Sequence, residues 1–389
     1  MPEKSTALNK EPVPVNRLRI AMVIDAYDDS TNGAVISTKR FVELLRKDHE
    51  VSIITTGKPA PGKILLRKFY APVVTRVMKK MKTPLAVPSD RILKKAIRNM
   101  DLIHVQFPFF LGVRVIRLAN RYGIPVVSTF HIQAEHLSMN AGIRSKQFIR
   151  YCYRFWIRNI YNRSDAVICP SHFAEEELKS NGLRSRSVVI SNGLLPDYHP
   201  VMVDRPESLR DKFIILSVGR FAPEKRQEMI IRAVSGSRYR DRIQLILIGE
   251  GPLREKLEEC GKDLSSSPLF LKLPPEELVY YYNIADLYVH AASVEVECMT
   301  VLEAIGCGLP PLIGSGPKSA TSQFALYDRF LFDCQSETDL VQKIDYWIDH
   351  PEELQRSKKL YVEESSGYRI EQSYEKLVSL YRSVIRKSQ

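Results

Sequence analysis

Short runs of consecutive apolar residues recur along the first half of the chain, and each ends in a polar or glycine-containing loop. The first run covers residues 18–24 and precedes a loop with Asn32-Gly33, a helical pattern at residues 42–45 and a second run at residues 51–55. Strand, helix and strand within about 40 residues is how a parallel doubly wound sheet begins. The later runs lie at residues 102–105, 126–129, 166–169 and 188–190. We expect ligands at the intervening loops, because ligands bind at the carboxyl edge of such a sheet.

The same pattern begins again after residues 199–206, which we interpret as a linker. The strand-like runs of this half lie at residues 213–218, 243–248, 287–290 and 312–313, with a helical pattern at residues 226–233. Residues 369–387 carry apolar side chains at helical spacing and predict a terminal amphipathic helix. Its apolar positions are Ile370, Tyr374, Leu377, Leu380 and Val384. The predicted fold class is therefore α/β, with two doubly wound domains facing each other across a cleft.

This pattern divides the chain into four parts. Residues 1–15 are polar, rich in Pro and Lys, and predict a flexible tail. Residues 16–200 form the N-terminal domain, residues 201–366 the C-terminal domain and residues 367–389 a C-terminal helix. The length of 389 residues fits two domains better than one.

Composition narrows the class of protein. An apolar fraction of 44% and a charged fraction of 26% are typical of a globular protein. No apolar run approaches the roughly 20 residues that cross a bilayer, and the N-terminus lacks the layout of a secretory signal, so we expect a cytoplasmic protein. The six cysteines form no Cys-x-x-Cys pair, which argues against a zinc site or a disulfide framework.

The formal charge of +12 suits an anionic partner such as nucleic acid, a membrane surface or a phosphorylated substrate. Residues 62–99 hold eleven Lys or Arg and a single acid, Asp90. Within this segment, residues 73–81 and 92–97 place apolar side chains at helical spacing beside Lys79, Lys80, Lys94 and Lys95. Such helices can lie in an anionic bilayer interface, although an ordinary solvated basic face has the same composition. We favour membrane contact.

Two further features of the first half bear on a possible membrane or lipid partner. Arg150, Arg154 and Arg158 form a second basic stripe at helical spacing. Phe107-Pro108-Phe109-Phe110 follows a predicted strand at the carboxyl edge of the first sheet. This apolar loop could receive an acyl chain, or it could belong to the core.

The strongest chemical signal is Glu295-Val-Glu-Cys-Met-Thr-Val-Leu-Glu303, in which two glutamates flank a turn and the start of a helix. Upstream lie Gly219-Arg220 and Lys225, followed by the Gly249-Glu250-Gly251-Pro252 loop. Arg220 can bind phosphate oxygens bidentately, and Lys225 supplies a compact second charge. The free N–H groups at the helix start, near Met299, Thr300 and Val301, add a dipole that favours phosphate.

In this order and spacing, the four motifs resemble the family 4 glycosyltransferases of the GT-B fold, which have two facing Rossmann-like domains. The resemblance implies that Glu295 holds hexose hydroxyls, Glu303 holds ribose hydroxyls and His131 lies against the donor sugar. It also implies that the backbone near Gly33 approaches the diphosphate, and that residues 367–389 cross back to the N-terminal domain. The implied reaction is retaining, and the departing phosphate can accept the proton of the acceptor hydroxyl. Electrostatic stabilisation of that phosphate would be its main catalytic contribution.

Combined with the basic segments and the apolar loop, the resemblance is closest to bacterial glycolipid synthases. It implies transfer of galactose or glucose from UDP-galactose or UDP-glucose to ceramide or diacylglycerol, giving an α-glycolipid. The enzyme would associate peripherally with the inner face of the cell membrane. A transferase for cell-surface polysaccharide or a polyprenyl-linked intermediate would need a similar basic surface and stays an alternative.

The chain departs from the family at two positions. Glu297 and Cys298 stand where the family usually has Phe-Gly. Glycine lets the donor approach the backbone, so Cys298 narrows the pocket or changes how the sugar lies. Glu297 could add a sugar contact or point to solvent. The departure leaves the identity of the donor sugar open.

We expect neither a metal nor a cofactor in the reaction. Asp25, Asp28 and Asp29 cluster in the first loop without forming an Asp-x-Asp motif, and they can equally be solvated turn residues. Arg220 and Lys225 can neutralise the leaving group without a divalent ion.

Three other functions fit parts of the sequence. Epimerases and phosphorylases share the fold, but neither an epimerase's acid–base set nor a pyridoxal lysine is recognisable. A nucleic-acid-binding protein would suit the charge, but the basic segments alternate with aliphatic rather than stacking aromatic residues. An inactive donor-binding protein would explain Cys298 but not the retained basic and acidic motif residues. The sequence carries no signal for an oligomeric state.

Overall fold

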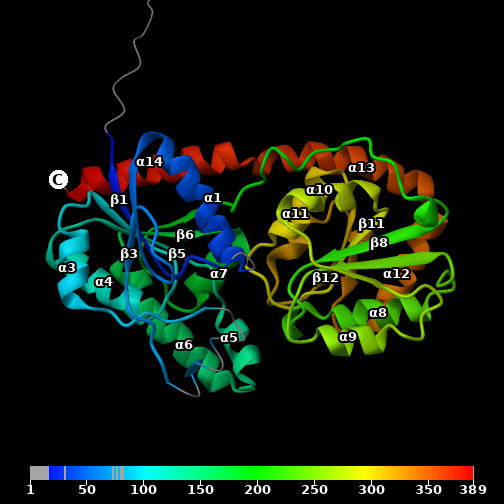
Figure 1. Cartoon of the computed structure of the whole chain (residues 1–389), viewed down its shortest axis with the longest axis horizontal. Helices are drawn as coiled ribbons and strands as arrows, with labels where there is room; N and C mark the ends of the chain where they lie inside the picture. The colour runs from blue at the N-terminus through cyan, green and yellow to red at the C-terminus, as the bar shows by residue number, and fades with distance from the viewer. Residues whose placement is uncertain (1–16, 30–31, 72–73, 76–77, 79–82, 389) are drawn as a thin grey trace, which may run out of the picture.

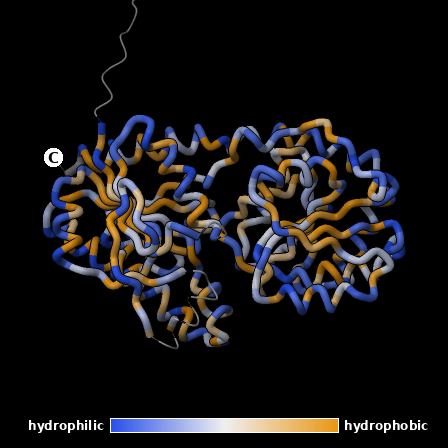
Figure 2. The backbone as a smooth tube through the Cα atoms, viewed as in Figure 1, coloured by the Kyte–Doolittle hydropathy of each residue, from blue (hydrophilic) through white to orange (hydrophobic). Residues whose placement is uncertain are grey.

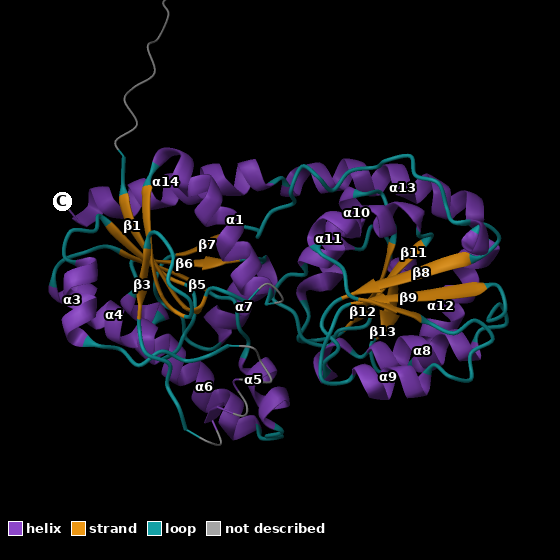
Figure 3. Ribbon diagram, viewed as in Figure 1, coloured by secondary structure: helices purple, strands orange, loops and turns teal. Residues whose placement is uncertain are grey.

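The chain folds into two α/β domains that lie side by side, each built on a parallel sheet with helices on both faces (Figure 1; Figure 3). The structure, a computed structural model, describes residues 17–29, 32–71, 74–75, 78 and 83–388. The predicted fold class is therefore confirmed. Among the described residues, no helix is both long and apolar enough to cross a bilayer.

The first sheet has the strand order β3-β2-β1-β4-β5-β6-β7, and every pairing is parallel. Its strands are β1 (Arg19–Ala26), β2 (Glu50–Thr56), β3 (Lys63–Leu65), β4 (Leu102–Val105), β5 (Val126–Thr129), β6 (Ala166–Cys169) and β7 (Ser187–Val189). Its helices are α1 (Gly33–Asp48), α3 (Asp90–Ile97), α4 (Phe110–Arg121), α5 (Ala134–Ala141), α6 (Lys146–Asn159) and α7 (His172–Ser180). The central strands are buried on both faces, as their unbroken apolar runs predict.

The second sheet has the order β10-β9-β8-β11-β12-β13, again entirely parallel. Its strands are β8 (Phe213–Val218), β9 (Ile243–Ile248), β10 (Leu269–Leu271), β11 (Leu287–His290), β12 (Pro311–Ser315) and β13 (Leu331–Asp333). Its helices are α8 (Gln227–Gly236), α9 (Arg254–Cys260), α10 (Pro275–Ile284), α11 (Met299–Gly306), α12 (Glu337–Asp349) and α13 (Pro351–Ser365). Single-turn 3-10 helices are η1 (Tyr161–Arg163), η2 (Glu207–Leu209), η3 (Pro223–Lys225), η5 (Asp328–Phe330) and η6 (Ser366–Tyr368), and η4 (Ala320–Phe324) is slightly longer.

Helix α14 (Ile370–Ser388) follows the second domain in sequence but packs on the first. Figure 1 shows α13 and α14 running end to end along one side of both domains, with α14 beside α1. Tyr381 in α14 hydrogen-bonds through its hydroxyl to Nδ1 of His104 at 2.6 Å, and Tyr374 donates to Asp48 at 3.0 Å. The terminal helix therefore completes the first core and links the two domains.

Each domain has its own large apolar core, built around its sheet, and the strands of both sheets are strongly hydrophobic in Figure 2. Phe107 is 1% exposed and belongs to the first core, so the suggestion that it receives an acyl chain is wrong. The apolar face of α3 is also buried in this core, through Leu93, Ala96 and Ile97, and cannot enter a bilayer. That part of the membrane prediction is wrong, because the apolar face that was predicted to meet lipid packs on the sheet instead.

Candidate active site

A cleft between the two domains brings together residues from both sheets. Among the predicted site residues that line it are Gly33, His131, Gly219, Arg220, Lys225, Glu295, Met299 and Thr300. They come from the carboxyl ends of strands or the starts of helices, which is where doubly wound folds bind ligands. Val301 and Glu303 lie deeper in α11, outside the lining of the cleft.

Glycine residues give Arg220 its place at the cleft. Gly219 ends β8 with a φ of +154°, and Gly249 ends β9 with a φ of +153°. A Cβ atom on Gly249 would lie 2.0 Å from the carbonyl oxygen of Gly219, so the two strand ends touch. Gly251 approaches Phe221 as closely, with a Cβ position 2.2 Å from its carbonyl oxygen. The Gly-Glu-Gly-Pro loop therefore packs on the backbone that carries Arg220.

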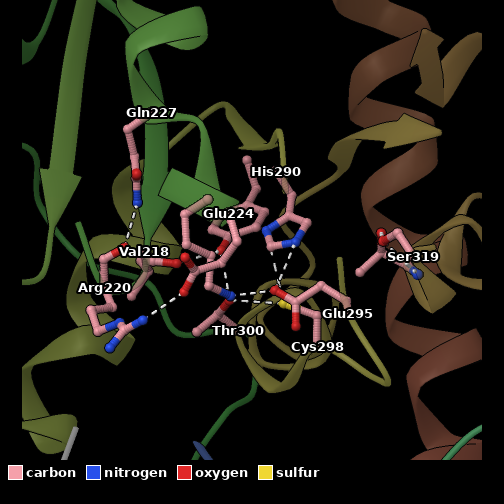
Figure 4. Close-up of polar contacts among 12 residues, drawn as sticks. Val218, Arg220, Glu224, Gln227, His290, Glu295, Cys298, Thr300 and Ser319 are labelled. Atoms are coloured by element: carbon pink, nitrogen blue, oxygen red, sulfur yellow. Dashed lines mark hydrogen bonds and ion pairs between the residues drawn. The ribbon is translucent and has the colours of Figure 1, made fainter. Parts of the chain in front are cut away.

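The two basic residues of the motif are each paired with a carboxylate. Arg220 donates to Glu224 at 2.7 Å and to Asn140 of α5 at 3.2 Å, so it links the second domain to the first. The ammonium of Lys225 contacts Oε1 of Glu295. Figure 4 shows the Arg220–Glu224 pair beside the cluster around Glu295. An anionic ligand that enters the cleft would meet both cations.

Glu295 stays ionised although it is buried. Burial disfavours the charged form, but the Lys225 ammonium and the neighbouring His290 hold the pKa of the Glu295 carboxyl at about 2. The pKa of Lys225 is raised, since its attraction to Glu295 outweighs the cost of burial. The carboxylate can therefore accept hydrogen bonds from sugar hydroxyls at neutral pH.

Two helices begin on opposite sides of the cleft. Asn32 caps α1 by accepting a hydrogen bond from Ala34 N at 3.0 Å. Helix α11 begins at Met299, and its Cε lies 3.4 Å from the position of a Cβ on Gly33. Both helix N-termini thus meet where Gly33 faces Met299, and their free N–H groups favour a phosphate there.

His131 follows β5 and is neutral at physiological pH. Burial lowers the pKa of its imidazole to about 4. Its Nε2 lies 2.8 Å from Oε1 of Gln106, an oxygen that can only accept, so Nε2 carries the proton. The other ring nitrogen is then an acceptor.

Glu303 is engaged in a buried contact between the domains. Arg40 of α1 donates to its Oε1 at 2.8 Å, and the hydroxyl of Tyr282 lies 3.2 Å from Oε2. Burial raises the pKa of the Glu303 carboxyl despite the opposing effect of Arg40. The assignment of Glu303 to the ribose stays a prediction, and it requires Arg40 to release this carboxylate.

Glu297 does not point to solvent, and that alternative is wrong. Its side chain is 5% exposed, and its Oε2 accepts hydrogen bonds from the N and Nδ2 atoms of Asn192 at 2.8 and 2.6 Å. Asn192 in turn accepts from Ser37 of α1 at 2.6 Å. Burial raises the pKa of the Glu297 carboxyl to about 7. The residue therefore joins the second domain to the first.

Cys298 lies beside His290 and Glu295 (Figure 4). Its Sγ is 3.8 Å from Nδ1 of His290, whose Nε2 is 3.4 Å from Oε1 of Glu295. Burial favours the neutral imidazole, but Cys298 and Glu295 raise the pKa of His290 to about 9. Burial also disfavours the thiolate, yet the charge of His290 lowers the pKa of Cys298.

Several residues of the site were not predicted from the sequence. His136 and Asn140 of α5 line the cleft, as does Glu224 of η3. A usable signal for the first two was their spacing of four residues in a helix that follows His131. Glu224 directly precedes Lys225 in the motif, and its role could have been considered with it. Arg40 had no local signal, because only the tertiary fold brings α1 to Glu303.

The residues predicted to face the acceptor are dispersed. Phe109 is partly buried, Phe110 is 54% exposed, and Lys94 and Lys95 are exposed on α3. Lys79 and Lys80 lie outside the described residues. The clustered aspartates have structural partners: Asp25 accepts from Ala86 N at 2.9 Å, and Asp28 pairs with Lys63.

Fold and site together describe two α/β domains whose shared cleft is lined by Arg220 and Lys225 and by the starts of α1 and α11, an arrangement that favours an anionic ligand. Two family profiles match the chain in succession, Glycosyltransferase Family 4 over residues 31–198 and Glycosyl transferases group 1 over residues 203–360. The chain therefore belongs to glycosyltransferase family 4, with the GT-B architecture, and is a glycosyltransferase. The predicted family is confirmed.

Its relatives include enzymes that are named for different substrates. A GDP-mannose-dependent alpha-mannosyltransferase of Mycolicibacterium smegmatis is 28% identical over 316 residues, 77% of this chain and 81% of the relative. The alpha-monoglucosyldiacylglycerol synthase of Streptococcus pneumoniae is 25% identical over 332 residues, 77% of this chain and 72% of the relative. The solved structure of Anabaena HepE in complex with UDP and glucose has a TM-score of 0.73 at 15% identity, covering 94% of this chain and 100% of that chain. That likeness bears on the fold alone.

Proposed function

We propose that this enzyme is a retaining α-hexosyltransferase that moves glucose or galactose from a UDP-sugar to a membrane lipid, diacylglycerol or ceramide. The activity for which the Streptococcus pneumoniae relative is named, synthesis of alpha-monoglucosyldiacylglycerol, supports a lipid acceptor and a hexose donor. Because other relatives are named GDP-mannose-dependent mannosyltransferases, GDP-mannose is the alternative donor that must be compared with the UDP-sugars.

The cleft supports the donor half of this proposal. As the bond between the sugar and the diphosphate breaks, negative charge gathers on the departing phosphate. Arg220, Lys225 and the N-terminus of α11 are placed to stabilise that charge, which is usually the largest catalytic contribution. Glu295 is charged and accepts hydrogen bonds from the hexose. The acceptor hydroxyl attacks from the face that the phosphate leaves, and the phosphate takes its proton.

The observation that carries the lipid proposal is a second cavity of about 650 Å³ at the carboxyl edge of the first sheet. Its lining is mainly aromatic and aliphatic and also includes the charged residues Asp28, Asp29, Lys58 and Lys68. The apolar lining residues are Ala26, Tyr27, Phe69, Tyr70, Val74, Met78, Pro84 and Leu85. A lipid can bury hydrocarbon here, whereas a sugar polymer would gain little from such walls.

This acceptor cavity adjoins the donor cleft. Thr83 lines the cleft and the next residue, Pro84, lines the cavity; likewise Asn32 lines the cleft and Asp29, three residues earlier, lines the cavity. The side chains of Asn32 and Thr83, which both line the cleft, are hydrogen-bonded to each other at 3.2 Å. An acceptor bound in the cavity can therefore extend its hydroxyl past this pair to the donor.

A basic groove on the first domain supports attachment to an anionic membrane. It has a volume of about 1060 Å³ and lies along α6, with Arg117 of α4 on one side. Its lining includes the exposed arginines Arg117, Arg150, Arg154, Arg158, Arg163 and Arg184. Within the described parts of the chain, none of the six is in an ion pair. Arginine binds lipid phosphate well, and the groove also presents Tyr151, which is 66% exposed, at its surface.

The deciding experiment offers UDP-glucose, UDP-galactose and GDP-mannose with diacylglycerol, ceramide and a water-soluble sugar acceptor, with the product anomer determined by NMR. We expect an α-glycolipid from a UDP-hexose. Val74→Trp, which fills the acceptor cavity, should abolish transfer to lipid and leave UDP affinity unchanged. Val87→Trp is the matched control, since Val87 is also partly exposed in this segment but does not line the cavity. Transfer to the sugar acceptor alone, or equal effects of both variants, would overturn the lipid assignment.

A further inference from the structure

Three metal-ligating side chains of different chemistry meet at the sugar end of the donor cleft. His290 ends β11, Glu295 lies in the following loop and Cys298 directly precedes α11. One donor atom from each lies within 4.8 Å of the others, and the three side chains are 3% to 7% exposed. Two of them, Glu295 and Cys298, line the cleft itself. Figure 4 shows His290 directed at both.

We propose that His290, Glu295 and Cys298 form a binding site for zinc, or an equally thiophilic divalent cation, whose occupation blocks the donor sugar. This goes beyond the proposed transferase reaction, for which we expect no metal. The site would make the enzyme sensitive to the availability of zinc.

The donor set matches zinc in type and spacing. Imidazole, thiolate and carboxylate are the side chains that bind zinc, at about 2.0–2.3 Å, and three protein ligands with one open position is a common arrangement. Tetrahedral ligands at these lengths stand about 3.3–3.8 Å apart. One ligand atom from each side chain lies within 4.8 Å of the other two. Nδ1 of His290 faces the Cys298 sulfur at 3.8 Å, whereas Nε2 faces the Glu295 carboxylate at 3.4 Å. Because one zinc ion binds only one ring nitrogen, the imidazole must turn to present a single nitrogen together with the sulfur and the carboxylate, and the cleft leaves the fourth position open.

Lys225 is the group that opposes this site. Its ammonium contacts Glu295, and a cation bound by Glu295 would have to displace it. Zinc and the Lys225–Glu295 ion pair are therefore alternative states of the same carboxylate. Because Glu295 is assigned to the hexose, zinc should compete with the sugar nucleotide and much less with UDP.

The primary test is direct metal binding, which does not depend on the identity of the donor or the acceptor. Co²⁺ added to the metal-free full chain should give the visible bands of tetrahedral coordination and a thiolate charge-transfer band, and Zn²⁺ should remove both. Cys298→Ser and His290→Gln should each weaken zinc binding by more than about 100-fold, since even outer-shell changes cost 10–100-fold. Cys260→Ser is the matched control, because Cys260 is a free cysteine in α9 away from the cleft.

Lys225→Met should change the affinity for zinc in the opposite direction. Removing the competing ammonium should tighten zinc binding, although the same substitution impairs use of the donor. In the parent protein, zinc should also protect Cys298 from alkylation, which mass spectrometry can measure without any variant. A cobalt spectrum without a thiolate band, or zinc binding that Cys298→Ser leaves unchanged, would overturn the proposal. So would inhibition by zinc that UDP-hexose does not relieve.

Discussion

Replacing Glu297 with glutamine removes a carboxyl group that the fold holds away from water. In the folded protein, burial raises the pKa of this carboxyl from 4.5 to about 7. Between these two pH values the folded chain keeps a proton that the unfolded chain has lost. The stability that this proton contributes is fully present below pH 4.5 and is lost as the pH rises through about 7. Glutamine stays neutral throughout, and its carbonyl oxygen can accept the same two hydrogen bonds from Asn192.

The size of the effect follows from the two pKa values. At 1.36 kcal/mol per pH unit, the interval from 4.5 to about 7 corresponds to about 3 kcal/mol. Relative to the parent, Glu297→Gln should therefore gain about 3 kcal/mol of unfolding free energy between pH 4.5 and pH 8. Burial also raises the pKa of Asp25 to about 7. Its effect on how the unfolding free energy depends on pH is the same in both proteins and cancels in the comparison.

Urea unfolding at pH 5 and pH 8 measures the difference. The two tryptophans, Trp156 in α6 and Trp347 in α12, report one domain each by fluorescence. With a urea dependence of about 3 kcal/mol per molar, the midpoint of the variant should move by about 1 M relative to the parent between these pH values. Glu259→Gln, at a side chain that is 68% exposed, should keep the parent's pH dependence. If the difference in unfolding free energy between Glu297→Gln and the parent is the same at both pH values, the burial argument is refuted.

Four shorter predictions address the reaction and the membrane. Arg220→Ala and Lys225→Ala should each lower kcat by about 100-fold or more in a UDP-release assay, and near-normal turnover in both would place the leaving group elsewhere. Glu303→Ala should weaken UDP binding in calorimetry whereas Glu295→Ala should spare it, and equal losses would contradict the ribose and hexose assignments. EDTA should not lower turnover, and a loss that Mg²⁺ restores would contradict a metal-independent reaction. Replacing Arg150, Arg154 and Arg158 of the basic groove with Glu should detach the protein from anionic liposomes. Binding of the parent protein should weaken as salt is added, since charge screening acts over about 8 Å. Unchanged co-sedimentation of the variant with liposomes would rule out this groove.

Much of the fold could be predicted from apolar runs, because central parallel strands are buried on both faces. Strands β4, β5, β6, β8, β9 and β11 have the predicted bounds. Three strands were missed: β3, β10 and β13. Each is an edge strand of only three residues, so its apolar run is too short to be told from a loop or a helix by its pattern.

The site was predictable where its residues share one local motif. Arg220, Lys225 and Glu295 belong to such motifs, and the structure brings them together in the cleft. The basic amphipathic pattern of α3 was misleading, because periodicity shows that a helix has an apolar face but not what covers it. The partners of Glu297 and Glu303 could not be predicted, since Asn192 and Arg40 meet them only after the domains are packed against each other.

The position of α14 has a consequence for the order in which the protein is made. The first core includes Leu377, Leu380, Tyr381 and Val384, which leave the ribosome only after the whole second domain has been made. Until they emerge, the nascent first domain exposes the apolar strip that they cover, and His104 lacks the hydroxyl of Tyr381. The domain that is synthesised first is therefore completed only after the second domain has been made, whereas the buried core residues of the second domain all lie within residues 194–361.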